Sequence, residues 1–114
     1  MRIVISQPMN GISDEEILST RMEIVRKFKE ANIEVIDTFF TGNKMDAQEY
    51  TSPALYYLGL SIDSIGRADA VYFVPGWDKA RGCVIEREIC KSYNIEILDS
   101  IPDPILEEKL KEVK

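Results

Sequence analysis

With 114 residues and a formal charge of −6, the chain is long enough for one hydrophobic core, so we expect a single domain spanning residues 1–114. Its apolar runs are far shorter than the roughly 18 to 20 residues of a membrane span, and the run after Met1 is too brief for a signal peptide, so we expect a soluble cytoplasmic protein without membrane contact. The 20 acidic residues outnumber the 14 basic ones and no basic patch is visible, which argues against a nucleic acid partner.

The first half of the chain predicts two strands separated by a helix. The apolar run at residues 2–6 is typical of a strand, and "SQPMNGIS" (6–13) has the Pro, Asn and Gly of a loop. Ser13 and Glu16 then form a capping box that opens a helix running to about Ala31. A second strand is expected over residues 33–40. The loop that follows, residues 41–52, is long for a small domain and is therefore a candidate functional segment.

The second half predicts two further helices and two further strands, followed by a charged terminal helix. "TSP" (51–53) supplies a cap and a proline at the first position of a helix, whose apolar stripe is Leu55, Leu58, Ile62 and Ile65. "DAVYFVPGW" (69–77) predicts a strand buried on both faces, because its apolar run is nearly continuous. A helix over residues 80–93, a short strand over 95–98 and a terminal helix over 102–114 complete the chain.

This alternation of strands and helices predicts an α/β fold: an open parallel sheet of four to five strands in a flavodoxin/Rossmann-like three-layer sandwich. Ligands of such sheets bind beyond the carboxyl ends of the strands, where the strand order reverses. The segments expected at that edge are residues 6–13, 37–50 and 75–82.

A glutamate on the expected buried face of the third helix is the strongest chemical signal. Counted from Gly82, the apolar stripe of that helix comprises Cys83, Ile85, Ile89, Cys90 and Tyr93. Glu86 falls roughly 20° from the centre of this stripe, whereas Glu88 points the other way. Burial raises the pKa of such a carboxyl group and the helix N-terminus partly opposes this, which leaves a poorly hydrated carboxylate suited to act as a nucleophile or base. The alternative interpretation is a glutamate that only interacts with the helix dipole or caps the helix.

The remaining chemistry is limited by what the chain lacks and by a few polar side chains. It has no histidine, which excludes Ser-His and Cys-His pairs and the HExxH zinc motif. Cys83 is expected to pack in the core. Lys79 and Arg81, next to a helix N-terminus, are candidate ligands of a phosphate or are solvated loop charges. Trp77 either stacks on a base or sugar, or covers the sheet edge.

The segment "ADAVYFVPGWDKARGCVIEREIC" (68–90) resembles the signature of the nucleoside 2-deoxyribosyltransferase-like family. That signature is an Ala-Asp-x-Val strand, a loop, a glycine, a glutamate four residues later and a small residue four further on. Here these are Ala68-Asp69, Gly82, Glu86 and Cys90. The first strand and "SQPMNG" (6–11) resemble the family's opening strand and its ligand loop, and the overall likeness is to a small branch of short bacterial and phage proteins.

The resemblance implies cleavage or transfer of the N-glycosidic bond of a (deoxy)nucleoside or its 5′-monophosphate, with Glu86 as nucleophile and with no metal or cofactor. Ser61 stands where the family usually has an aspartate, and Ala80 where the transferases carry an acid, so Asp63 or Asp78 is the expected acid. The expected substrate-binding residues are Ser6, Gln7, Pro8, Met9, Asn10, Gly11, Trp77, Lys79, Arg81 and Gly82. The alternative function is a non-catalytic nucleotide-binding or sensor module of the same fold.

The resemblance also implies subunits that complete each other's sites, and a small four-stranded sheet buries a modest fraction of its surface. We therefore expect a homodimer or a larger homo-oligomer. A light-scattering measurement that gives the monomer mass at micromolar concentration would contradict this expectation.

Overall fold

The computed structural model describes residues 1–36 and 44–101. Three predicted features fall wholly or partly outside these ranges: the end of the second strand, the start of the long loop that follows it, and the terminal helix over residues 102–114.

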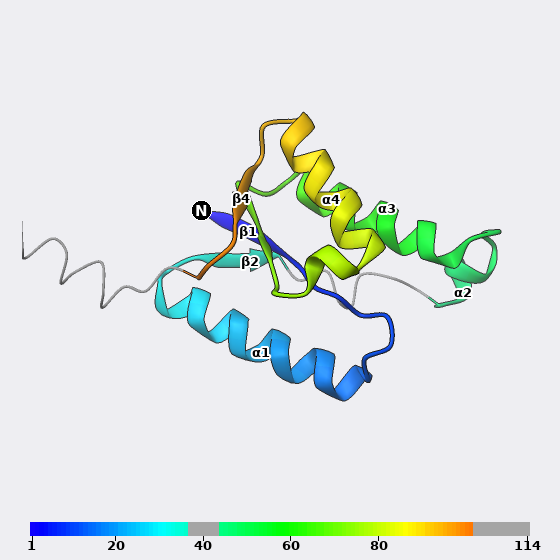
Figure 1. Ribbon diagram of the computed structural model, residues 1–114, viewed down its shortest axis with the longest axis horizontal. Coiled ribbons are helices and arrows are strands. Elements are labelled where there is room, and N and C mark those ends of the chain that lie inside the picture. Colours follow the sequence, from blue (N-terminus) through cyan, green and yellow to red (C-terminus); the bar gives the residue numbers. More distant parts are fainter. Residues whose placement is uncertain (37–43, 102–114) are drawn as a thin grey trace, which may run out of the picture.

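The core of the molecule is a four-stranded sheet in which every strand pair is parallel. Its strands are β1 (Arg2–Ser6), β2 (Glu34–Ile36), β3 (Ala70–Phe73) and β4 (Glu96–Leu98), in the spatial order β2-β1-β3-β4. Helix α1 lies on one face of this sheet, and α3 and α4 lie on the other (Figure 1). The predicted α/β fold with an open parallel sheet between two helical layers is therefore confirmed.

The helices begin where the sequence places their caps. Helix α1 (Asp14–Glu30) follows Ser13, whose hydroxyl accepts a 3.2 Å hydrogen bond from the backbone N–H of Glu16. Helix α3 (Pro53–Ile65) has Ser52 as its N-cap and Pro53 in its first turn, and α4 spans Arg81–Ser92.

Two short elements were not predicted. Helix α2 (Lys44–Gln48) lies inside the segment expected to be a loop, because residues 44–48 contain neither Gly nor Pro and have adequate helix propensity. A 3-10 turn, η1 (Trp77–Lys79), follows Gly76, whose positive φ of 97° favours glycine.

Alternate residues of β1 and β3 pack on the two faces of the sheet. On the α1 side, Phe28 meets Tyr72 edge-on with the ring centroids 5.5 Å apart, within a cluster that also contains Ile3, Ile5, Ile24, Ala70 and Val74. On the α3 and α4 side the buried cluster consists of Val4, Ile65, Val71, Phe73 and Cys90. The core thus uses both faces of β3, as its continuous apolar run predicts.

The predicted apolar stripes of α3 and α4 are only partly buried. Leu55 is 63% exposed, and Ile62, Ile85 and Tyr93 are also exposed. Strands of three to five residues cover only a narrow strip of each helix. In α3 it is the C-terminal end that reaches the sheet, through Ile65. In α4 the buried residues are Cys83, Glu86 and Cys90.

Arg87 ties α4 to its surroundings. Its Cζ lies 4.1 Å from the ring centroid of Trp77 and 5.0 Å from that of Phe73. Its Nη1 and Nη2 donate to the two carboxylate oxygens of Asp99, at 2.8 and 3.0 Å. One guanidinium group therefore connects α4, η1, the end of β3 and the residue that follows β4. We call this arrangement the Arg87 clamp.

Replacing Arg87 by methionine is expected to destabilise the fold by about 1–2 kcal/mol, because the stacking and the paired hydrogen bonds are both lost. Arg26 offers a control: it too pairs with carboxylates, those of Glu23 and Glu30, but both lie on its own helix and at the surface. Urea unfolding of R87M and R26M measures the difference. Equal midpoints for the two variants would show that the clamp contributes nothing beyond a surface ion pair.

Candidate functional site

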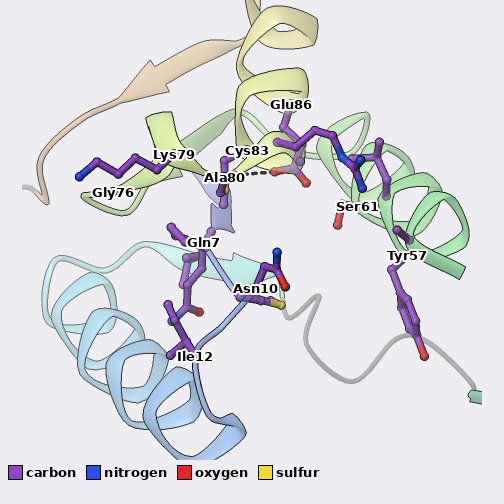
Figure 2. A pocket seen from close by; sticks show the side chains of 18 residues that line it. Gln7, Asn10, Ile12, Tyr57, Ser61, Gly76, Lys79, Ala80, Cys83 and Glu86 are labelled. Carbon is purple, nitrogen blue, oxygen red and sulfur yellow. Dashed lines mark hydrogen bonds between the residues drawn. The ribbon is translucent and has the colours of Figure 1, made fainter.

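A cavity of about 800 Å³ opens at the carboxyl ends of β1 and β3. The strand order reverses between these two strands, because the chain moves from β1 to β2 on one side and to β3 on the other. The volume is in the range of about 300–1,000 Å³ that is usual for small-molecule sites. Figure 2 shows its three walls: the loop after β1, helix α3, and η1 with the start of α4.

Glu86 lies in the wall formed by α4 and is 8% exposed. Its Oε2 accepts a 2.5 Å hydrogen bond from the hydroxyl of Ser6, the last residue of β1 (Figure 2). Glu88, two residues further along, is exposed and pairs with Lys91 at 3.4 Å. The helical spacing therefore predicted correctly which of the two glutamates is buried.

The pKa of Glu86 is raised above its ordinary value because the carboxyl group is buried. The hydroxyls of Ser6 and Ser61 and the charge of Arg21 oppose this rise. Ser6 belongs to β1, Ser61 to α3 and Arg21 to α1. Groups from three elements therefore help to keep a desolvated carboxylate ionised.

Gln7 joins the loop after β1 to helix α1. Its Nε2 donates to the carbonyl oxygen of Ile17 at 3.0 Å, and its Oε1 accepts from the Nη1 of Arg21 at 3.3 Å. Gln7 and Arg21 are both buried. The amide of Gln7 thus has a structural role in holding the base of the loop, even though the residue lines the cavity.

Cys83 also lines the cavity, one helical turn before Glu86, and is buried as expected. Burial raises the pKa of its thiol, the Ser6 hydroxyl lowers it, and the charge of Glu86 raises it further. Cys83 is therefore a neutral thiol beside the carboxylate.

Eight of the predicted substrate-binding residues line the cavity: Ser6, Gln7, Pro8, Met9, Asn10, Lys79, Arg81 and Gly82. Figure 2 shows the side chain of Lys79 extending away from Glu86. Asn10 lies on the opposite wall, in the loop after β1.

Four predicted site residues do not line the cavity: Asp63, Asp78, Gly11 and Trp77. Asp63 is two residues from Ser61 on α3, so it turns to the outer face and pairs with Arg67 at 3.2 Å. Asp78 is exposed in η1. The ring of Trp77 is covered by Arg87, and Gly11 turns the loop with a φ of 80°. The sequence placed one of the two aspartates at the cavity, and neither of them lines it.

The wall formed by α3 lies outside the predicted site residues. It consists of Ala54, Tyr57, Leu58 and Ser61, and the remaining lining residues that were not predicted are Ile5, Ile12, Gly76, Ala80 and Cys83. The α3 residues are spaced three or four apart, so the sequence places them on one face of the helix. It does not indicate which face of this helix lines the cavity. Ser61 occupies the position where the resembled family has its aspartate, and this position does face Glu86 (Figure 2).

Within the described part of the chain, no cluster of three or more His, Cys, Asp or Glu side chains is arranged to hold a metal ion. No helix in residues 1–36 and 44–101 has the length and apolar character needed to cross a membrane.

Replacing Glu86 by glutamine is expected to stabilise the fold at neutral pH, because glutamine still accepts the hydrogen bond of Ser6 but buries no charge. At pH values between the ordinary pKa of 4.5 and the raised pKa of Glu86, the folded protein binds more protons than the unfolded chain. The wild-type fold therefore loses stability as the pH rises through this range. The gain of E86Q over wild type should therefore be small below pH 4.5 and grow until that raised value is passed.

Thermal unfolding of the wild type and E86Q from below pH 4.5 to neutral pH measures the gain in stability. E88Q serves as the control for removing an exposed carboxylate from the same helix. A gain that does not change with pH would contradict the proposed cause.

Comparison with known proteins gives one finding. Neither the curated proteins nor the solved structures include a match to the chain. Residues 1–99 match a family described as a domain of unknown function, DUF4406. These residues include all four strands and every described residue of the cavity, and the chain belongs to the DUF4406 family.

Proposed function

We propose that the protein cleaves or transfers the N-glycosidic bond of a (deoxy)nucleoside or nucleoside 5′-monophosphate, with Glu86 as the nucleophile. The single observation that supports this most directly is a buried carboxylate, fixed by a 2.5 Å hydrogen bond, in the wall of a cavity of nucleoside size. The resemblance to nucleoside 2-deoxyribosyltransferase-like proteins points to the same glutamate.

In this mechanism a carboxylate oxygen of Glu86 attacks the anomeric carbon of the sugar as the bond to the base breaks. The transition state has oxocarbenium character, so the negative charge of Glu86 stabilises it as well as forming the new bond. Ser6 restricts the orientation of the carboxylate before the substrate arrives, which reduces the entropy lost in reaching the reactive geometry. Water or a second base then attacks the glycosyl-enzyme and releases Glu86.

The substrate lies between the loop after β1 and the start of α4. The amide of Asn10 offers hydrogen bonds to sugar hydroxyls from the loop side. Arg81 is the first residue of α4, where a 5′-phosphate gains both the guanidinium charge and the helix N-terminus.

A second candidate function is a nucleotide-binding or sensor module without catalytic activity. One observation favours it: neither Asp63 nor Asp78, the acids expected from the sequence, lines the cavity. Nucleoside binding does not require a general acid, so a site that lacks these aspartates suits a binding or sensor module.

The two functions are separated by incubating the protein with N-glycosides of both neutral and positively charged bases and measuring free base. Wild-type protein should release base from at least one of them. E86Q should lose this activity, because it lacks the nucleophile, but should still bind the same compound through the unchanged shape and hydrogen bonds of the site, more weakly where the base is positively charged. E88Q, altered on the exposed side of α4, should behave as wild type. Base release by E86Q within a few-fold of wild type would show that Glu86 is structural. Binding without release by the wild type would favour the sensor module.

A further inference from the structure

The immediate surroundings of Glu86 bear on how the leaving base is stabilised. Its carboxyl group interacts with the hydroxyls of Ser6 and Ser61, and the thiol of Cys83 lies one turn away. Among the described residues that line the cavity, Glu86 is the single carboxylic acid. Serine hydroxyls are too weakly acidic to protonate a departing base, and burial makes the Cys83 thiol a weaker acid than an ordinary cysteine. Tyr57 and Lys79 also line the cavity, but Figure 2 shows both side chains extending away from Glu86.

The identity of the base decides whether the reaction needs an acid at this position. A neutral nucleobase leaves with the electron pair of the broken bond and needs a proton from an acid, a contribution of about 10²–10⁴-fold in rate. A base that is bound through a positively charged ring nitrogen takes up the same electron pair and becomes neutral. It therefore departs without any acid.

Building on the function proposed above, we propose that the substrates of this site are N-glycosides of positively charged bases, such as pyridinium ribosides and their 5′-monophosphates. The described part of the site is built around one carboxylate with two hydroxyl partners. A cationic substrate is attracted to that carboxylate in the ground state as well as in the transition state. The cavity wall that carries Ser61 accommodates the base without protonating it.

The reaction balances without a further reactant except water. A carboxylate oxygen of Glu86 forms a bond to the anomeric carbon, the bond from that carbon to the ring nitrogen breaks, and its electron pair neutralises the nitrogen. Water then attacks the anomeric carbon, the ester bond to Glu86 breaks with its electron pair returning to the carboxylate, and the proton of the water passes to the solvent. The products are a neutral pyridine, the free sugar and one proton.

This proposal predicts the shape of the pH–rate profile. Glu86 acts only in its ionised form, so kcat/KM for a pyridinium riboside should rise with pH through the pKa of Glu86 and then stay level. A reaction that needs an acid gives a falling limb at higher pH, whichever residue supplies the proton. This measurement uses the wild-type protein and does not depend on the folding of any variant.

Ser61 provides the converse test. Ser61→Asp places a second carboxyl group opposite Glu86, and the repulsion between the two raises the pKa of one of them, which makes an acid available. S61D should therefore gain at least about 10-fold on neutral nucleosides, well within what an acid contributes, and should not gain on pyridinium ribosides. Asp63→Asn, on the outer face of the same helix, is the matched control and should leave both activities unchanged.

The experiment compares nicotinamide riboside and its 5′-monophosphate with deoxyadenosine, deoxyinosine, thymidine and their monophosphates, with free base measured by chromatography. Release from the pyridinium compounds with a level profile at high pH, at least about 100-fold faster than from the neutral ones, supports the proposal. Release from neutral nucleosides at comparable rates, or a falling limb with the pyridinium compounds, overturns it and leaves the N-glycosidase function standing. Release from none of the compounds overturns both.

Discussion

The hydrogen bond between Ser6 and Glu86 joins the two parts of the molecule on which the candidate site depends, the end of β1 and the first half of α4. A carboxylate with 8% exposure is tolerated only where donors replace the water it has lost. The parallel pairing of β1 with β3 brings the Ser6 hydroxyl to this position, since Ser6 is aligned with Phe73, the last residue of β3 before the turn that leads to α4. The geometry of the site is therefore a direct result of the register of the central strands.

The rigidity of that arrangement comes from the opposite side of α4. Arg87 packs on Phe73 and Trp77 and binds Asp99, so the helix is held to η1, β3 and the end of β4. Gln7 fixes the other wall by bridging Ile17 and Arg21 on α1. A side chain on a helix that is held from both sides keeps its position better than one on a loop, and the nucleophilic role proposed for Glu86 requires such a fixed position.

Local patterns in the sequence were enough to predict the strands, the capped helices and the burial of Glu86, because each depends on periodicity or on a neighbouring residue. Ser13 and Ser52 cap their helices by contacts three residues away, and β3 is apolar throughout because both its faces are covered. Asp63, Asp78 and Trp77 were placed at the site because they are near it in sequence. Their actual positions depend on helix rotation and on Arg87, which are tertiary effects. Periodicity groups Tyr57, Leu58 and Ser61 on one face of α3, but only the packing of α3 against α4 turns that face to the cavity.

Glu86 and Arg87 are consecutive residues with different tasks: one faces the cavity and the other holds the helix in place. Each residue of an α-helix turns the direction of the side chain by about 100°. One residue inserted or deleted between the start of α4 and Glu86 would therefore change the rotation of the helix. Either the carboxylate would turn away from Ser6, or Arg87 would lose its contacts with Trp77 and Asp99. The number of residues in this stretch is therefore fixed by contacts on both sides of the helix. Insertions and deletions in functional members of this fold are expected before Gly76 or after Asp99, and not between Arg81 and Arg87.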